Sequence, residues 1–205
     1  MDLLLRRRQM TATQGIQRIE WLGSDSKAYI DTGISGGIDT LEFEIEFSYS
    51  SHVAYGAIYG NYVNDQTNGI RLILEYSSGY AIVCNNTICT TTGNTDVSCG
   101  IGSIHQAKIN FDEVSLDGSS YTITRKARGN TNSGRIALFN RSLTNPNTSR
   151  NIGLKIFSFK IRDNGVLLRD FIPVRVGNDG YMYDNVSRTL FGNIGTGNFI
   201  LGQDI

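Results

Sequence analysis

Three glutamates at alternate positions of one segment are the residues whose types and spacing most directly suggest chemistry. Residues 41–50 read LEFEIEFSYS, so Glu42, Glu44 and Glu46 share one face of an extended strand. Alternate strand positions lie about 6.8 Å apart along the backbone, and a retaining glycosidase needs two carboxyl groups about 5–5.5 Å apart. Converging side chains would let Glu42 and Glu46 act as such a pair. The alternative, which we favour, is a solvated charged face of a half-buried strand.

A second group of candidate residues consists of three cysteines and a histidine. They follow the spacing C-x4-C-x9-C-x5-H, a donor set that zinc accepts: Cys84, Cys89, Cys99 and His105. The spacing matches no strong zinc-binding pattern. A turn at residues 85–86 would put Cys84 and Cys89 about 7–8 Å apart on a diagonal, whereas a disulfide needs Cβ atoms about 3.5–4.5 Å apart. We therefore expect small buried core cysteines and no bound metal.

Aromatic side chains suited to recognition are concentrated in residues 53–84. Five tyrosines there form a candidate rim for a glycan or protein partner: Tyr55, Tyr59, Tyr62, Tyr76 and Tyr80. The alternative is that these rings cover a sheet edge and bind nothing. Trp21, the only tryptophan, has apolar neighbours and is predicted to pack in the core. His52 and His105 have no motif around them that would predict a catalytic triad.

The first fourteen residues differ from the rest because they show no strand periodicity and carry Arg6, Arg7 and Arg8. We expect residues 1–14 to form a basic arm and residues 15–205 to form the folded domain. The arm is either a loose end or a segment that docks on a neighbouring subunit, with its arginines paired to carboxylates. The order MDLLLRRRQM is wrong for a signal peptide, and no apolar run approaches the about 18 residues of a membrane span.

Composition favours one all-β domain. The chain has 205 residues, 23 glycines and 2 prolines, and it is rich in aromatic and β-branched residues that prefer strands. Nineteen basic and nineteen acidic residues cancel, so the net charge gives no reason to expect nucleic acid or an anionic membrane as a partner.

The strongest local signal is a hairpin around Asp163-Asn164-Gly165, because Asn-Gly tolerates the positive φ angles of a tight turn. Simple pairing across this turn would set Asp170 opposite Phe159 on a buried face, at a cost of several kcal/mol. Either Arg169 or Arg175 partners the carboxylate, or a bulge after Gly165 moves Asp170 to the solvent face. We favour the bulge.

Other turn residues mark further boundaries. Asp117-Gly118 predicts a second hairpin, and the spaced glycines of residues 192–199 predict a turn and not a phosphate loop. Pro173 lacks a backbone donor, so its strand is expected to lie at an edge or to be interrupted there.

Three segments of the chain resemble a known family. Residues 155–175 (KIFSFKIRDNGVLLRDFIPVR), residues 180–202 (GYMYDNVSRTLFGNIGTGNFILG) and residues 29–34 (YIDTGI) are similar to laminin-G-like, concanavalin A-type jelly rolls of gut bacterial surface and bacteriophage proteins. The resemblance covers residues 16–203 and implies an antiparallel two-sheet jelly-roll sandwich. It also implies that Tyr29 and Ile30 lie on a strand that pairs near the chain's end, which brings the two ends of the domain together.

The resemblance assigns no catalytic residue to this chain. Glycosidases with this jelly roll usually have Asp in the middle of the three carboxylates and several tryptophans around the cleft, whereas this chain has Glu44 and a single Trp. Some laminin-G-like domains bind calcium through loop carboxylates, for which Asp96, Asp163 or Asp179 are the candidates here. These residues are not clustered along the chain, so we expect no cofactor.

These observations together predict a non-catalytic structural or decoration protein on the surface of a bacteriophage virion. In this interpretation the jelly roll is displayed for adhesion to glycans or a host surface, and Arg6, Arg7 and Arg8 dock the arm to other virion subunits. Two alternatives stay open. One is a carbohydrate-binding module of a bacterial surface system, and the other is a retaining glycosidase that uses Glu42 and Glu46.

Overall fold

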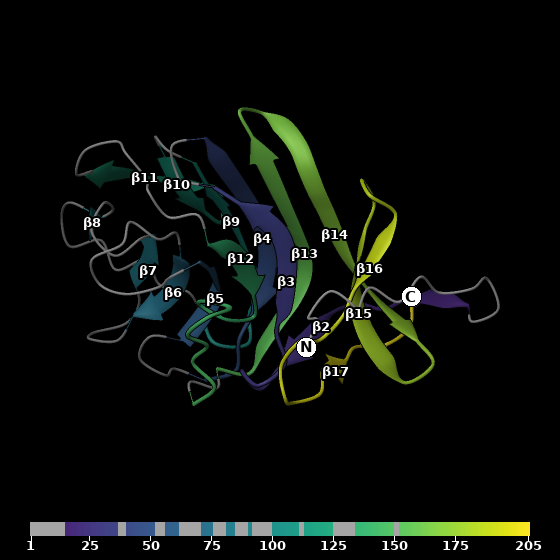
Figure 1. Cartoon of the computed structure of the whole chain (residues 1–205). Helices are drawn as coiled ribbons and strands as arrows, with labels where there is room; N and C mark the ends of the chain where they lie inside the picture. Colours follow the sequence, from purple (N-terminus) through teal and green to yellow (C-terminus); the bar gives the residue numbers. More distant parts are fainter. Residues whose placement is uncertain are drawn as a thin grey trace.

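The computed structural model describes most of the chain: residues 15–36, 40–51, 56–61, 71–75, 81–84, 90–91, 100–110, 113–124, 134–149 and 152–205. Within these residues there are seventeen strands and no helix, and the strands form two antiparallel sheets that pack together (Figure 1). The predicted all-β sandwich is confirmed, and the arrangement is compatible with a jelly roll.

The larger sheet has twelve strands and the smaller sheet has five. The larger contains β1 (Ile16–Arg18), β2 (Leu22–Ser24), β4 (Leu41–Ser48), β8 (Thr90–Thr91), β9 (His105–Ile109), β10 (Glu113–Leu116), β11 (Ser119–Thr124), β13 (Leu154–Asp163), β14 (Val166–Val176), β15 (Asp179–Asp184), β16 (Thr189–Phe191) and β17 (Ile200–Leu201). Its main path runs β16-β15-β14-β13-β4-β9-β10-β11-β8. The smaller sheet contains β3 (Ile30–Ser35), β12 (Arg135–Leu138), β5 (Gly56–Gly60), β6 (Arg71–Glu75) and β7 (Ala81–Cys84), in that order.

Both predicted hairpin turns form as expected. Asn164 and Gly165 have φ angles of 48° and 79°, and Asp117 and Gly118 have φ angles of 50° and 81°. Two successive residues with positive φ are typical of a type I′ turn, which matches the right-handed twist of the strands on either side. The turns therefore connect β13 to β14 and β10 to β11 without splaying the strands.

A bulge in the β13–β14 hairpin resolves the conflict at Asp170. The pairing shifts by one residue at Leu168, so that Phe159 faces Phe171 and Lys160 faces Asp170. Both phenylalanine side chains are fully buried, whereas Asp170 is half-buried on the outer face. The predicted bulge is confirmed, and no carboxylate opposes Phe159.

Away from the turn, β13 and β14 no longer pair with each other, and strands from the two ends of the folded domain pair with them instead. β2 pairs with the start of β13, β1 pairs with the end of β14, and β17 pairs with β2. Pro173 lies between the part of β14 that pairs with β13 and the part that pairs with β1. The predicted interruption of the strand pairing at Pro173 therefore occurs on this edge of β14. The backbone of Tyr29 forms hydrogen bonds with Asn193 and Ile194. Ile30, however, belongs to β3, which pairs with β12. The expected pairing of Ile30 with a strand near the chain's end is therefore wrong.

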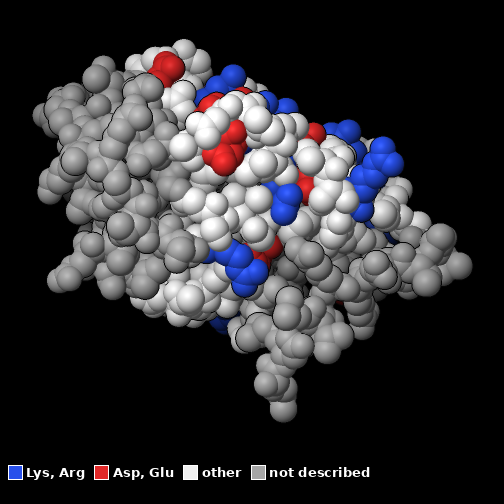
Figure 2. Space-filling view, turned by 45° about the horizontal axis from the view of Figure 1, so that its top comes forward, with Lys and Arg blue, Asp and Glu red and all other residues white. Residues whose placement is uncertain are grey.

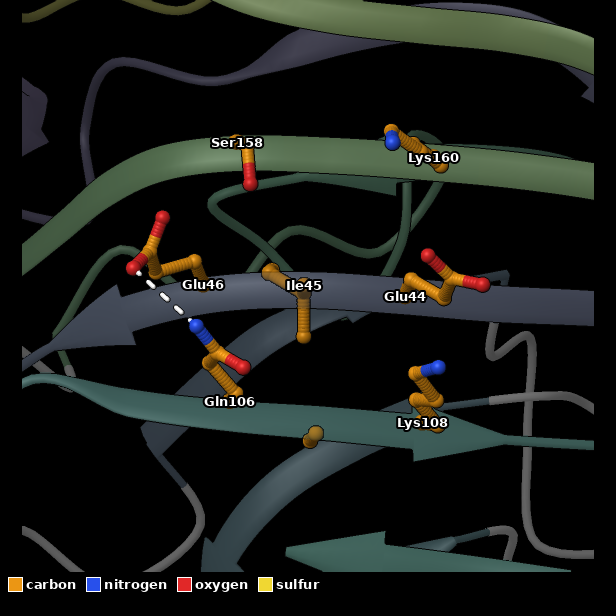
Figure 3. Close-up of a pocket in the computed structure, with 8 residues that line it drawn as sticks. Glu44, Ile45, Glu46, Gln106, Lys108, Ser158 and Lys160 are labelled. Atoms are coloured by element: carbon orange, nitrogen blue, oxygen red, sulfur yellow. Dashed lines mark hydrogen bonds between the residues drawn. The ribbon is translucent and has the colours of Figure 1, made fainter. Parts of the chain in front are cut away.

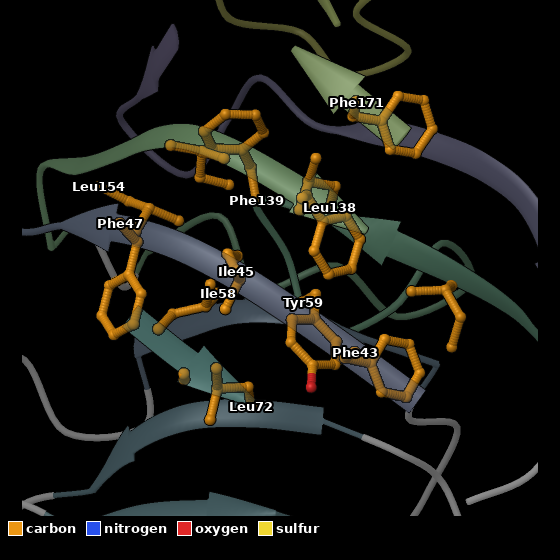
Figure 4. Packing of buried hydrophobic residues seen from close by; sticks show 14 of the residues in the cluster. Phe43, Ile45, Phe47, Ile58, Tyr59, Leu72, Leu138, Phe139, Leu154 and Phe171 are labelled. Atoms are coloured by element: carbon orange, nitrogen blue, oxygen red, sulfur yellow. The ribbon is translucent and has the colours of Figure 1, made fainter. Parts of the chain in front are cut away.

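The core lies between the two sheets and is built around aromatic rings (Figure 4). Phe43 of β4 stacks on Tyr59 of β5 with ring centroids 4.7 Å apart, and Phe159 lies 5.2 Å from Tyr59. Tyr59 has no exposed surface, so its predicted role in a binding rim is wrong. The prediction failed because alternation along the sequence does not reveal which face of a strand meets the second sheet.

A buried carboxylate fixes the turn between β15 and β16. Asp184 is fully buried and accepts hydrogen bonds from the backbone N–H groups of Asp170, Val186 and Ser187 and from the Ser187 hydroxyl. Arg169 lies 3.6 Å away and donates to the Thr32 carbonyl of β3 in the smaller sheet. Because its lone pairs are satisfied, the carboxylate can stay buried and link two strands and a turn.

Replacement of Phe159 by Ala tests the core assignment. Phe159→Ala should lower the free energy of unfolding by about 3–5 kcal/mol, because it leaves a cavity among packed rings. The matched control is Val166→Ala, because Val166 is 64% exposed at the hairpin tip and should change stability by less than about 0.5 kcal/mol. Urea denaturation measures both variants, and equal losses for the two would contradict the core assignment.

The carboxylate of Asp204 should make part of the stability pH-dependent. Arg175 donates two hydrogen bonds to it, of 2.6 and 2.5 Å, and these bonds hold the pKa of Asp204 below its ordinary value of 3.8. A lowered folded-state pKa means that the pair stabilises the fold above pH 3.8 and loses this effect as the pH falls through the folded-state value. The melting-temperature difference between wild type and Asp204→Asn should therefore be constant near neutral pH and shrink in acid. A difference independent of pH would contradict the pairing.

Candidate functional site

The outer face of the larger sheet carries a row of alternating charges. Strand register places Lys108 of β9 beside Glu44 of β4, Glu44 beside Lys160 of β13, and Lys160 beside Asp170 of β14. Neighbouring strands lie about 4.8 Å apart, so the row extends over roughly 14 Å. Positive and negative side chains are also interspersed over the described surface seen in Figure 2, with no large field of one sign.

A shallow hollow of about 150 Å³ lies along this row. The main chain at Ile45 and Ala107 contributes to its floor, because both side chains point into the core. Six polar side chains from β4, β9 and β13 line it (Figure 3): Glu44, Glu46, Gln106, Lys108, Ser158 and Lys160. Pockets for drug-sized ligands are typically about 300–1,000 Å³, so the hollow is large enough only for a small unit such as one sugar ring.

The polar groups of the hollow are unequally engaged. Glu44 accepts a 2.7 Å hydrogen bond from Arg162, and Glu46 accepts a long one of 3.4 Å from Gln106. Three other lining side chains form no hydrogen bond or ion pair with any residue in the described part of the chain: Lys108, Ser158 and Lys160. These side chains therefore offer donors to a ligand, and Glu46 offers an acceptor.

Trp21 lies on the same outer face and not in the core, so its predicted position is wrong. Its half-buried ring packs on Gly23, where an added Cβ would come within 3.0 Å of the ring. The ammonium group of Lys155 lies 4.3 Å from the ring centroid, in a cation–π contact. One face of the Trp21 ring is therefore already occupied by Lys155.

His105 has a structural role. It is 4% exposed, with Nδ1 2.7 Å from a carboxylate oxygen of Asp117 and Nε2 2.9 Å from the carbonyl oxygen of Gly100. Asp117 also accepts a hydrogen bond from the backbone N–H of Gln106. Both ring nitrogens are engaged within the fold, so neither is open to zinc.

Several residues considered in the sequence analysis lie outside the described residues. These are Arg6, Arg7, Arg8, His52, Tyr55, Tyr62, Tyr76, Tyr80, Cys89, Asp96 and Cys99. The side chain of Cys84, at the end of β7, is likewise not described. In the part of the chain that the structure covers, no three His, Cys, Asp or Glu side chains come together as a metal site would require.

Sequence reasoning identified the glutamates of β4 but missed the residues beside them. Gln106, Lys108, Ser158 and Lys160 reach the hollow only because β9 and β13 flank β4. In β9 (HQAKI) the buried and exposed residues alternate, but such alternation in a sequence does not indicate which strand lies next to the exposed side chains.

The chain matches no protein-family model, and no curated protein gives a significant match. Over the described residues, the structure contains no helix of the length and apolarity needed to cross a bilayer.

The geometry of β4 argues against the alternative in which Glu42 and Glu46 form a pair of catalytic carboxylates. Glu42 and Glu46 are four residues apart on a continuous strand, which corresponds to roughly 13–14 Å and not to the about 5–5.5 Å of a retaining pair. Glu44, which lies between them, is held by Arg162.

We therefore expect no release of reducing sugar from a broad panel of β-glucans. The Glu42→Gln and Glu46→Gln variants provide the control. Sugar release by the wild type that both substitutions abolish would establish a glycosidase and contradict this expectation.

Proposed function

We propose that the protein is a non-catalytic recognition module that binds a hydroxyl-rich glycan in the hollow on the outer face of its larger sheet. The observation that carries the proposal is a set of polar groups from adjacent strands that the described residues leave largely unengaged: the donors Lys108, Ser158 and Lys160, and the weakly engaged acceptor Glu46. A sugar hydroxyl both donates and accepts hydrogen bonds, so it can use both kinds of group.

The charges of the hollow favour a neutral ligand over a polyanion. Its two lysines and two glutamates cancel, so an anionic polymer gains no net attraction there. An apolar ligand would leave the lysines and Glu46 desolvated and unpaired, at a cost that its burial would not recover. A neutral glycan avoids both penalties.

For the biological setting, we propose the surface of a bacteriophage particle. This part rests on the resemblance of residues 155–175 and 180–202 to laminin-G-like, concanavalin A-type jelly rolls of phage and gut bacterial surface proteins. The all-β sandwich is compatible with that family. The basic arm of residues 1–14 would then attach the module to other virion subunits through Arg6, Arg7 and Arg8.

Glycan binding is tested on an array of neutral and acidic glycans. The Lys108→Met/Lys160→Met double variant should bind its preferred neutral glycan about tenfold more weakly, because two charged donors are lost. Lys27→Met is the matched control, because Lys27 is an exposed lysine in the loop after β2 and should leave binding unchanged. Wild-type binding should vary little with salt, and binding restricted to acidic glycans or lost at high salt would contradict the proposal.

Particle attachment is tested separately, with a chain that lacks residues 1–14. This variant should lose co-sedimentation with the particle and keep its glycan binding. Glycan binding without any particle association of the full chain would instead favour the alternative of a carbohydrate-binding module of a bacterial surface system.

A further inference from the structure

Both ring nitrogens of His105, the first residue of β9, face oxygen atoms that act as hydrogen-bond acceptors. Nδ1 lies 2.7 Å from a carboxylate oxygen of Asp117, and Nε2 lies 2.9 Å from the carbonyl oxygen of Gly100. Neutral imidazole carries one N–H donor and one acceptor nitrogen, whereas imidazolium carries two donors. Only the protonated ring can therefore donate to both oxygens at once.

Asp117 is well suited to pair with a cation. Its second carboxylate oxygen accepts a 2.8 Å hydrogen bond from the backbone N–H of Gln106, and its side chain is 44% exposed. An N–H donor and contact with solvent both favour the ionised form of a carboxylate. His105 itself is 4% exposed, and a buried charge is tolerated when a partner of opposite charge is bonded to it. The pair therefore permits an imidazolium at this position.

Aromatic rings pack against the imidazole on the β4 side. Phe47 and Tyr49 have ring centroids 5.8 and 6.3 Å from that of His105. Among the described residues, the phenol of Tyr49 is thus the titratable group that accompanies the carboxylate at this ring. Glu46 of β4 and Lys108 of β9 line the hollow on the opposite face of the sheet. The carboxylate is therefore the charged group that acts directly on the ring.

The same imidazole holds the loop that leads into β9. Residues 100–104 read GIGSI, and the carbonyl of Gly100 is the group that faces Nε2 of His105. Further along the loop, the N–H of Gly102 donates a 2.8 Å hydrogen bond to the carbonyl of Tyr49. The two isoleucines of the loop are 50% and 53% exposed. Since little apolar surface of the loop is buried, polar contacts such as these hold it in place.

We propose that His105 is a proton-dependent latch for the loop of residues 100–104. In acid, the imidazolium donates to both Asp117 and Gly100 and holds the loop against β9. When the ring loses one proton to solvent, the remaining N–H stays on the carboxylate, because a charged acceptor forms the stronger hydrogen bond. The lone pair of Nε2 then faces the carbonyl oxygen of Gly100, and two acceptors that face each other without a proton release the loop.

Heteronuclear NMR of the full chain tests the protonation state directly. At about pH 5 both ring nitrogens of His105 should show the chemical shifts of protonated nitrogens, and at about pH 9 only Nδ1 should. The backbone amides of Ile101, Gly102 and Ser103 should titrate with the same midpoint as the ring, and their order parameters should fall on the alkaline side as the loop is released. A ring that carries a single proton in acid, or loop amides that do not follow the ring, would overturn the proposal.

Substitution of the histidine gives a second readout, the melting temperature. The latch needs the charged ring, so its contribution to stability is complete in acid and is lost as the pH rises and the ring becomes neutral. The advantage of wild type over His105→Gln should therefore be about 2–4 °C larger at about pH 5 than at about pH 9, the size expected for one interaction in a domain of this length.

The matched control for this measurement is His52→Gln. His52 is the other of the two histidines in the chain, and its replacement should leave the pH dependence of the melting temperature unchanged. An advantage over His105→Gln that is equal at both pH values would contradict the latch. The NMR titration uses the wild type, so it decides the proposal even where the variant does not fold. Neither measurement involves glycan binding, so the outcome is separate from that of the proposed function.

Discussion

The extra residue at Leu168 is the constraint on which the surface of the larger sheet depends. A shift of one residue in a strand exchanges its inner and outer faces, so the bulge decides what β14 presents to solvent. With it, Phe171 joins Phe159 in the core and Asp170 extends the charged row beside Lys160. The same choice directs Ile172 away from the core. One irregularity in one hairpin therefore decides which side chains of β14 extend the charged row.

Hydrogen bonds occupy backbone groups along the β3 edge of the smaller sheet, and this limits how that edge can bind a partner. Arg169 donates a hydrogen bond to the Thr32 carbonyl of β3, and the Thr32 hydroxyl accepts one from the backbone N–H of Ile34. At the start of the strand, Asn193 accepts from the Tyr29 backbone, and the Tyr29 carbonyl accepts from Ile194. Groups bonded in this way are not available to a strand from another chain. Recognition by addition of a strand at β3 is thus disfavoured, and the face of the larger sheet is the better surface.

The features that depend only on neighbouring residues in the sequence were predicted correctly. The turn at Asn164-Gly165 and the alternation of β4 depend on backbone φ preferences and on hydrophobic period, which a sequence shows directly. Tyr59 and Trp21 were misplaced because their burial depends on which strands lie above and beside them. The hollow was missed for the same reason, since Lys108 and Lys160 approach Glu44 only through the pairing of three strands that are distant in sequence.

The small size of the hollow is consistent with a role on a particle. A volume of about 150 Å³ buries little more than one sugar ring, and a contact of this size gives dissociation constants on the order of millimolar. Such a site is too weak to hold a single subunit on a cell. In the proposed setting, many copies displayed on one particle bind together, because each engaged site raises the effective concentration of the next. Weak, neutral and shallow recognition therefore suits a protein displayed in many copies, whereas a soluble enzyme that acts alone would need a deeper pocket.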